Sequence, residues 1–306
     1  MVRTACPALV LLLLLSARPV LAEPPSEPAS SAPRSSAQSS PTLSTAEAAE
    51  DAIDRGDDAE AVRLYRLAAD RGEAKGQVGL AQLHARGLGG LRSDFEKAAR
   101  LLRLAAAQGD AAGQAGLGAL YQLGQGVPRD LMEAARLYRL AVAQGDPKAQ
   151  NNLATLLRNG EGGLTKDEAD AVRLFRLAAA QGHAGAQSNL GAAYEAGIGG
   201  LPQDENKAVY WYELAAASGD MRAQTNLGAS YATGSRGLRH DDKAAVRLFQ
   251  LAADQGWATA QFNLGLMYET GRGGLPPSKE EARHLYRLAA QQGYKAAERG
   301  LDRLGR

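Results

Sequence analysis

The chain has 306 residues, of which 45% are hydrophobic and 5% aromatic, and its formal net charge at pH 7 is +1. This is an ordinary profile for a folded protein, and it excludes a global basic or acidic field that would indicate a nucleic acid or a membrane surface as partner. Alanine and glycine are abundant, which favours close packing of backbones over a large aromatic core.

Residues 1–22 have the organisation of a secretory signal peptide. Arg3 provides a short basic region, residues 8–15 form an apolar run, and Val20-Leu21-Ala22 is a small-residue cleavage site. The apolar run is too short to span a bilayer, although an uncleaved anchor is the alternative. We therefore expect export to the periplasm or the medium, with no stable membrane insertion after cleavage.

Cleavage would remove Cys6, the only cysteine, together with Arg3 and Arg18, which changes the formal charge from +1 to −1. The exported protein would then have no disulfides, thiol chemistry or thiolate metal sites. Residues 23–43 are rich in Ser, Pro and Ala and have few apolar side chains, which predicts a disordered linker.

One phrase, Leu-Ala-Ala/Val-x-x-Gly, recurs through the rest of the chain. Its leucines are Leu67, Leu104, Leu140, Leu177, Leu214, Leu251 and Leu288, at spacings of 37, 36, 37, 37, 37 and 37 residues. A fixed period in this range predicts stacked supersecondary units whose neighbours bury each other's apolar faces.

Each of these leucines belongs to a predicted helix that we call helix B. Ten residues before the leucine stands a good N-cap residue, in order Asp57, Asp94, Asp130, Asp167, Asp204, Asp241 and Ser278. Glu60, Glu133 and Glu281 follow three residues later, so we expect capping boxes in those units. The glycine five residues after the leucine favours a left-handed helix end.

A second predicted helix, helix A, surrounds a leucine thirteen residues further on: Leu80, Leu117, Leu153, Leu190, Leu227, Leu264 and Leu301. Small residues follow this leucine in most units and permit close backbone approach. Helix A is expected to end at a glycine such as Gly197, and a second glycine such as Gly200 continues a glycine-rich loop to helix B. A phosphate-binding loop is disfavoured, because no Lys-Ser/Thr follows and no strand precedes it.

The sequence Ala-Gln-x-Asn-Leu-Gly-x-x-Tyr, followed by Gly-x-Gly and an Asp-capped Ala-Val-x-Leu-Tyr-x-Leu-Ala-Ala-x-x-Gly, closely resembles the Sel1-like repeat, a relative of the tetratricopeptide repeat. The best matches are residues 186–219 and 260–293. We expect a degenerate first repeat over 44–72, six repeats over 73–293 and a C-terminal capping helix over 294–306. The resemblance implies an all-α, right-handed α-solenoid of antiparallel helix pairs, with helix A lining the concave face.

Four asparagines occupy the position just before the helix A leucine, namely Asn152, Asn189, Asn226 and Asn263. An amide offers both donors and an acceptor, so such a row can pair with the backbone of an extended peptide. In related tetratricopeptide domains, asparagines at this position bind peptide backbone. The alternative is that these side chains make hydrogen bonds within the protein.

Lys75, Lys148 and Arg222 stand five residues before the leucine, where related domains sometimes hold a terminal carboxylate, although solvated cations are the alternative. Phe262 falls on the predicted concave face and, with Trp257, is a candidate aromatic anchor. The alternative is that these aromatics cap the end of the stack.

Helix B carries a row of arginines: Arg63, Arg100, Arg136, Arg173 and Arg247. An anion-binding convex face is one interpretation, and the other is a set of salt bridges to acidic residues three or four positions earlier. The row is interrupted at Tyr210, expected at the surface, next to Trp211 and Tyr212, expected in the core.

The sequence offers no catalytic residue, metal site or cofactor site: the four histidines lie in different units, and no serine-lysine, zinc or nucleophile-elbow motif is present. We expect an exported scaffold, not an enzyme, that binds a protein or peptide partner in the concave groove. The alternative is a weak cell-envelope hydrolase, β-lactamase-like or peptidoglycan-acting, similar to cysteine-rich Sel1-repeat proteins. A third option is a secreted effector.

Overall fold

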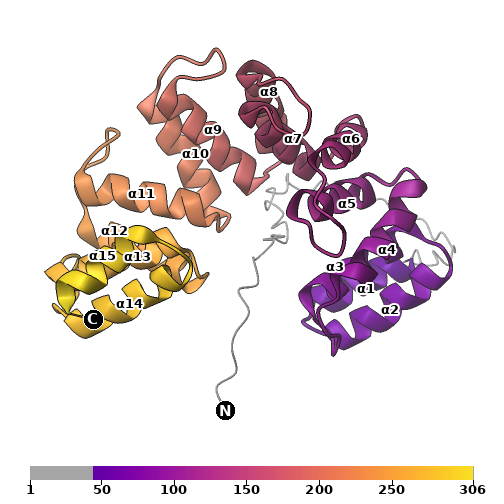
Figure 1. Cartoon of the computed structure of the whole chain (residues 1–306), viewed down its shortest axis with the longest axis horizontal. Helices are drawn as coiled ribbons and strands as arrows, with labels where there is room; N and C mark the ends of the chain where they lie inside the picture. Colours follow the sequence, from indigo (N-terminus) through magenta and orange to yellow (C-terminus); the bar gives the residue numbers. More distant parts are fainter. Residues whose placement is uncertain (1–43, 306) are drawn as a thin grey trace, which may run out of the picture. The chain divides into compact units, whose positions relative to one another are not determined.

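The computed structural model describes residues 44–305, so the predicted signal peptide (1–22) and linker (23–43) lie outside the described residues. Within them the chain forms helices and no strands (Figure 1). The A helices are α1 (Thr45–Asp54), α3 (Ala74–Arg86), α5 (Ala111–Leu123), α7 (Pro147–Asn159), α9 (Ala184–Ala196), α11 (Met221–Thr233) and α13 (Ala258–Thr270).

The B helices alternate with them along the chain. They are α2 (Asp58–Asp70), α4 (Phe95–Ala107), α6 (Leu131–Val142), α8 (Glu168–Ala180), α10 (Glu205–Ala217), α12 (Asp242–Asp254) and α14 (Lys279–Gln291), and α15 (Lys295–Leu304) follows the last pair. Each A helix contacts its own B helix most extensively and the preceding B helix next. The all-α solenoid of stacked helix pairs is therefore confirmed.

The two kinds of helix lie on different sides of the stack. Neighbouring A helices contact one another, as in the pairs α1–α3, α3–α5, α5–α7 and α11–α13. No two B helices in the described chain approach each other to this extent. The A helices therefore line the inner side, which we call the helix A face.

The predicted N-caps of helix B are confirmed in all seven units. Asp94, for example, accepts a hydrogen bond from the backbone N–H of Lys97 at 2.8 Å. Each such cap contributes about 1 kcal/mol to helix stability. The capping boxes predicted at Glu60, Glu133 and Glu281 are wrong.

In place of such a box, Glu60 and Glu133 accept hydrogen bonds from Arg63 and Arg136, one turn further on, at 2.6 and 2.7 Å. The guanidinium binds the carboxylate through two hydrogen bonds, and this replaces the bond that the carboxylate would accept from the N-cap backbone N–H in a capping box. Among the described residues the reciprocal box occurs only at the start of α1, between Ser44 and Glu47.

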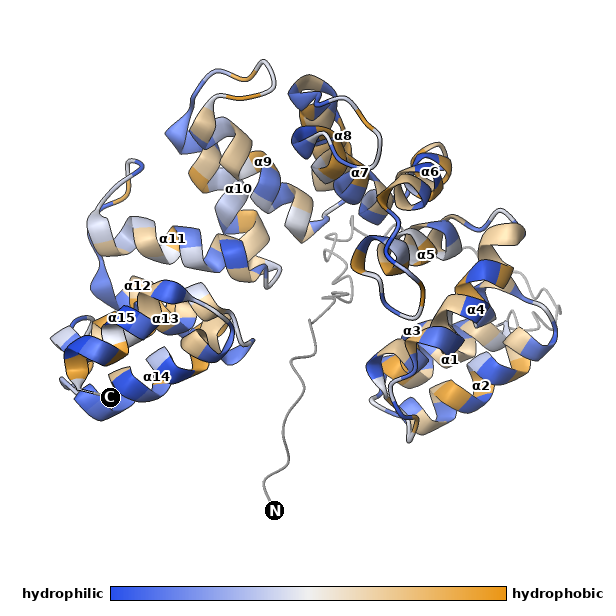
Figure 2. Ribbon diagram, in the orientation of Figure 1, coloured by the Kyte–Doolittle hydropathy of each residue, from blue (hydrophilic) through white to orange (hydrophobic). Residues whose placement is uncertain are grey.

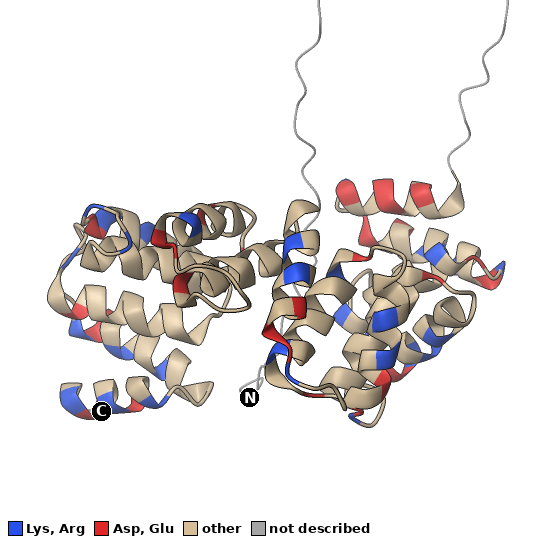
Figure 3. Ribbon diagram, turned by 90° about the horizontal axis from the view of Figure 1, so that it is seen from above, with Lys and Arg blue, Asp and Glu red and all other residues tan. Residues whose placement is uncertain are grey.

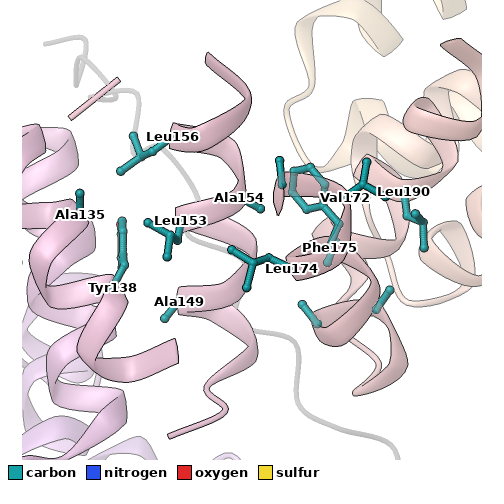
Figure 4. Packing of buried hydrophobic residues seen from close by; sticks show 14 of the residues in the cluster. Ala135, Tyr138, Ala149, Leu153, Ala154, Leu156, Val172, Leu174, Phe175 and Leu190 are labelled. Atoms are coloured by element: carbon teal, nitrogen blue, oxygen red, sulfur yellow. The ribbon is translucent and has the colours of Figure 1, made fainter. Parts of the chain in front are cut away.

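In every helix B except α4, which has Leu102, an aromatic side chain is buried in the core. Tyr138 of α6 packs against Gly118 of α5, where an added Cβ would lie 2.8 Å from the ring, and faces Leu153 of α7 (Figure 4). Leu174 and Phe175 of α8 lie on the other side of α7 in the same view. Small residues on helix A therefore make room for the rings of helix B.

Each helix carries both polar and apolar residues, and the apolar side packs on its neighbours (Figure 2). Tyr212 is buried in the core, as predicted, and Tyr210 is exposed, as predicted. Trp211, predicted in the core, is half-buried and packs against it.

Candidate functional site

The predicted asparagine row lies on the helix A face, over the aromatic residues of the preceding B helices. Asn152 donates from Nδ2 to the hydroxyl of Tyr138 at 3.3 Å. Asn189 is buried and donates from Nδ2 to Oδ1 of Asn151 at 2.9 Å. These two side chains therefore have partners inside the protein, as the alternative interpretation expected.

The bonds of Asn152 and Asn189 belong to one chain of hydrogen bonds, which we call the polar relay. In order from donor to acceptor, its members are Arg222, Asn189, Asn151, Asn152, Tyr138 and Gln122. Its donor–acceptor distances run from 2.6 to 3.4 Å. The relay joins five helices, from α11 back to α5, and so fixes polar side chains along the helix A face.

The other two asparagines are half-buried in α11 and α13. Asn226 lies beside Tyr212, whose pKa is raised, mainly by burial. Asn263 forms no side-chain hydrogen bond with any residue of the described chain and occupies the corresponding position over Phe249, which has no hydroxyl to offer. Asn152 and Asn226 thus contact a tyrosine of helix B, whereas Asn189 bonds to Asn151 instead.

Lys148 is exposed near the start of α7, and Arg222 is exposed near the start of α11. Desolvation lowers the pKa of Lys148 against the opposing charge of Asp146. Because Lys148 is exposed, this shift reflects the protein atoms that crowd it rather than enclosure. Both predicted cations therefore lie on the helix A face. For Lys148, protein atoms replace part of the hydration shell.

Arg158, near the end of α7, is a third cation of this face that sequence reasoning missed. Its guanidinium carbon lies 5.6 Å from the ring centroid of Phe175, in cation–π contact. Burial lowers the pKa of Arg158, and the charge of Arg222 lowers it further. Arg158 follows Lys148 by ten residues, about 2.8 helical turns, so register within α7 alone does not assign the two cations to one face.

His183 was also missed, because its role is visible only in the structure. It is the N-cap of α9, and its Nδ1 accepts a hydrogen bond from the backbone N–H of Ala186 at 3.1 Å. Burial and the charge of Lys148 lower the pKa of His183, whereas Asp146 and Asp220 raise it. The side chain is therefore neutral, with its proton on Nε2.

Phe262 of α13 is half-buried and contacts two other rings. Its centroid lies 5.3 Å from that of Tyr286 and 5.3 Å from that of Tyr294. Such tilted ring pairs stabilise a cluster beyond the area that they bury. The predicted aromatic anchor is thus part of the C-terminal core cluster of α13, α14 and α15.

A cavity of about 280 Å³ opens near the N-terminal end of the helix A face. Its lining residues are Glu50, Tyr65, Lys75, Val78, Gly79, Gln82, Asp110 and Ala112. Gly79 stands where other units have asparagine, and a Cβ there would lie 2.3 Å from the ring of Tyr65. Burial and the charge of Glu50 raise the pKa of Tyr65 to about 12, so its hydroxyl remains a donor.

On helix B the salt-bridge interpretation holds for three arginines. Arg63 pairs with Glu60 at 2.6 Å, and Arg136 and Arg173 pair with the acids three residues before them at 2.7 Å. Basic and acidic residues are both distributed over the structure in Figure 3. These exposed pairs contribute only a few tenths of a kcal/mol each.

Between residues 44 and 305 no three His, Cys, Asp or Glu side chains are grouped closely enough to hold a metal ion. None of the helices in this part of the chain has the length and apolarity that crossing a bilayer requires.

The solved structures similar to this one include the following three. A Sel1 repeat protein from Oxalobacter formigenes is 29% identical with a TM-score of 0.65, and the match covers 81% of this chain and 97% of that chain. A protective antigen present in uropathogenic Escherichia coli is 29% identical with a TM-score of 0.56, covering 85% and 56%. An immunity protein from Pseudomonas aeruginosa is 22% identical with a TM-score of 0.51, covering 70% and 83%.

A search of curated proteins found no match. The Sel1 repeat pattern, by contrast, matches the chain seven times, at residues 50–73, 74–110, 111–146, 147–183, 184–220, 222–257 and 258–294. Sel1 repeat solenoids commonly serve as scaffolds for protein–protein interaction. Matches over most of the chain, together with the stacked helix pairs, show that this protein belongs to the Sel1 repeat family.

Proposed function

We propose that the protein is an exported scaffold that binds a polypeptide partner along the helix A face. The observation that carries this proposal is the polar relay, which holds amide groups in fixed positions across several consecutive helices. An extended chain has unpaired N–H and C=O groups along its whole length and is complementary to such a row.

The relay leaves hydrogen-bonding capacity for a partner. Asn151 and Asn152 are only half-buried, and each donates one of its two amide hydrogens within the relay. A guanidinium has five N–H groups, and Arg222 uses one of them in its bond to Asn189, at the long distance of 3.4 Å. Since these side chains are already ordered, binding loses less conformational entropy than it would on a flexible surface.

The test is site-specific photo-crosslinking in the native envelope, with a crosslinking residue at Ala112 on α5 or at Leu104 on α4. Ala112 is exposed on the helix A face, and Leu104 is exposed on helix B. We expect one polypeptide to be captured in near-stoichiometric amount from Ala112 and not from Leu104. Capture from Leu104 alone would overturn the assignment of the binding face.

Export is the second part of the proposal, and it is supported by the order of residues 1–22. The expected result is a mature protein in the periplasmic or extracellular fraction whose N-terminal residue is Glu23. An intact N-terminus, or recovery only with the cytoplasm, would contradict export.

A further inference from the structure

Three cations of the helix A face, Lys148, Arg158 and Arg222, form what we call the central cation cluster. Lys148 and Arg158 belong to α7, and Arg222 belongs to α11. In the described chain none of the three forms an ion pair with an acidic side chain, although eleven ion pairs occur elsewhere in it. The cluster therefore has positive charge without a direct counter-charge.

The surroundings disfavour this charge when the site is empty. Burial and then the charge of Arg222 lower the pKa of Arg158 against the opposing charge of Glu168, and desolvation lowers the pKa of Lys148 against that of Asp146. An anion placed among these groups would regain the electrostatic energy that partial desolvation and mutual repulsion remove.

The N-cap of α9 keeps a negative charge out of the cluster. The A helices α5, α7 and α11 are capped by aspartates, whereas α9 is capped by the neutral imidazole of His183. The two neighbouring aspartates, Asp146 and Asp220, are used as caps, with Oδ1 accepting backbone N–H bonds at 2.7 and 2.8 Å. His183 thus occupies a cap position close to Lys148 where an aspartate would add a second carboxylate to that of Asp146.

The spacing of the cations indicates more than one carboxylate. Ten residues of α-helix separate Lys148 from Arg158, which is about 15 Å along the axis of α7. One carboxylate cannot contact both ends of that interval. An extended chain covers it in about five residues, at ~3.3 Å per residue.

We propose that the central cation cluster binds the side-chain carboxylates of an acidic, extended segment of the partner, while the adjacent amides of the polar relay bind its backbone. This inference rests on the proposed use of the helix A face and adds the chemistry of what that face recognises. Guanidinium–carboxylate bonds are charge-assisted and directional, which favours acidic segments over neutral ones of the same length.

The probe is a fluorescein-labelled, C-terminally amidated decapeptide with alternating glutamate and alanine, and its binding to residues 23–306 is measured by fluorescence anisotropy. The same peptide with glutamine for glutamate is the first control, and the glutamine peptide with a free C-terminus is the second. We expect the glutamate peptide to bind about tenfold more tightly than either control at low salt, and less tightly as salt screens the charges.

The matched variants are His183→Asp and Arg247→Gln, each of which lowers the net charge by one. His183→Asp retains an N-cap and places a carboxylate beside Lys148, so it should weaken binding of the glutamate peptide about fivefold or more without lowering the melting temperature. Arg247 is exposed on helix B, so its substitution should leave binding unchanged.

Equal affinity for the glutamate and glutamine peptides, or a preference for the free C-terminus, would overturn the inference, as would equal effects of the two variants. The proposed function is tested separately through Ala112, which lies outside the cluster. If a partner is crosslinked from Ala112 but the glutamate peptide does not bind, the scaffold proposal is retained and only the acidic-segment inference is rejected.

Discussion

Every helix A after α1 has a buried glutamine, which is paired in most units with a glutamine at the C-terminal end of helix B. Gln108 donates to Gln77 at 2.9 Å, and the same bond recurs between the corresponding residues at 3.0, 3.0, 3.1 and 2.9 Å. In one unit the donor is replaced by Ser218, and Oε1 of Gln187 is buried without a partner. The recurrence of glutamine before five of the seven glycines that follow helix B was the sequence signal for this pair.

Ser218→Gln should therefore stabilise the protein by about 1–2 kcal/mol, because it supplies the missing donor to a buried acceptor. The measurement is the free energy of unfolding from denaturant titration. Ser218→Ala is the control, since it changes the side chain without adding a donor. A glutamine variant no more stable than the alanine variant would show that Gln187 is satisfied in another way.

His183 makes stability depend on pH. Its pKa is lowered from 6.5 in the folded state, first by burial and then by Lys148, so the unfolded chain takes up the proton first. Its contribution is fully present above about pH 6.5 and is lost as the pH falls through the lower folded-state value, when Nδ1 can no longer accept from Ala186. Unfolding free energies from pH 7.5 to 5.5 should decline more steeply for the wild type than for His183→Asp.

At the scale of the helix, α4 illustrates what the repeating pattern predicts. The pattern identifies where the helices lie in the sequence, but it does not identify which face of each helix packs against its neighbours. The recurring leucine that defines the period is exposed at Leu104, to 55%, and also at Leu67, Leu140, Leu177, Leu214 and Leu251. The alanine that follows it is fully buried, as at Ala105, because the helices approach too closely there for a larger side chain. Period and capping are local properties, whereas this close approach depends on the neighbouring unit.

Leu102→Ala and Leu104→Ala form a matched pair within α4. Leu102 is 6% exposed in the core, so its truncation should cost about 2–5 kcal/mol. The same truncation at Leu104 should change stability by less than about 0.5 kcal/mol. Thermal melting of both variants checks this difference, and similar losses would mean that the exposed leucines pack in solution.

The loop between α11 and α12 contains Arg236, the one non-glycine residue with positive φ, +55°, in the described chain. The corresponding residue of the preceding unit is Gly199, where a Cβ would lie 2.4 Å from a backbone oxygen of helix B. Arg236 is held by an ion pair with Glu195 and a 2.6 Å hydrogen bond to Ser230. Side-chain contacts between units thus maintain a backbone conformation that arginine disfavours.

Arg236→Gly should relieve that backbone strain but leave Glu195 without its counter-charge. We expect a net loss of about 1 kcal/mol, because the pair is only partly buried and solvent screens the remaining charge. Combining it with Glu195→Gln should recover most of the loss. A single glycine variant more stable than the wild type would show that strain outweighs the ion pair.

At the scale of the whole molecule, the fold was predictable because each unit repeats its own caps, glycines and apolar spacing. The candidate site was only partly predictable: the asparagine row and two of its cations follow from register within one unit. Arg158, Asn151 and His183 acquire their roles from contacts between units, on α7, α9 and α11. A single sequence contains no direct signal for such contacts.

The stack also predicts which unit can be removed. Deleting residues 73–109 joins Gly72 to Asp110, which keeps the N-cap of α5. Tyr65 would then face Gly116, and glycine is also the residue that it faces now, at Gly79. Deleting residues 110–145 would instead place Leu102 against the asparagine of α7 and leave an amide without the tyrosine hydroxyl that it now contacts.

We therefore expect the first deletion to retain the wild-type mean residue ellipticity within about 10% and a cooperative thermal transition, because each unit contacts only its neighbours. Its affinity for the glutamate peptide should match that of the full protein, since the central cation cluster is untouched. The second deletion should unfold at a lower temperature than the first. Two deletions of equal stability would show that any pair of units can stack, whichever residues meet at the junction.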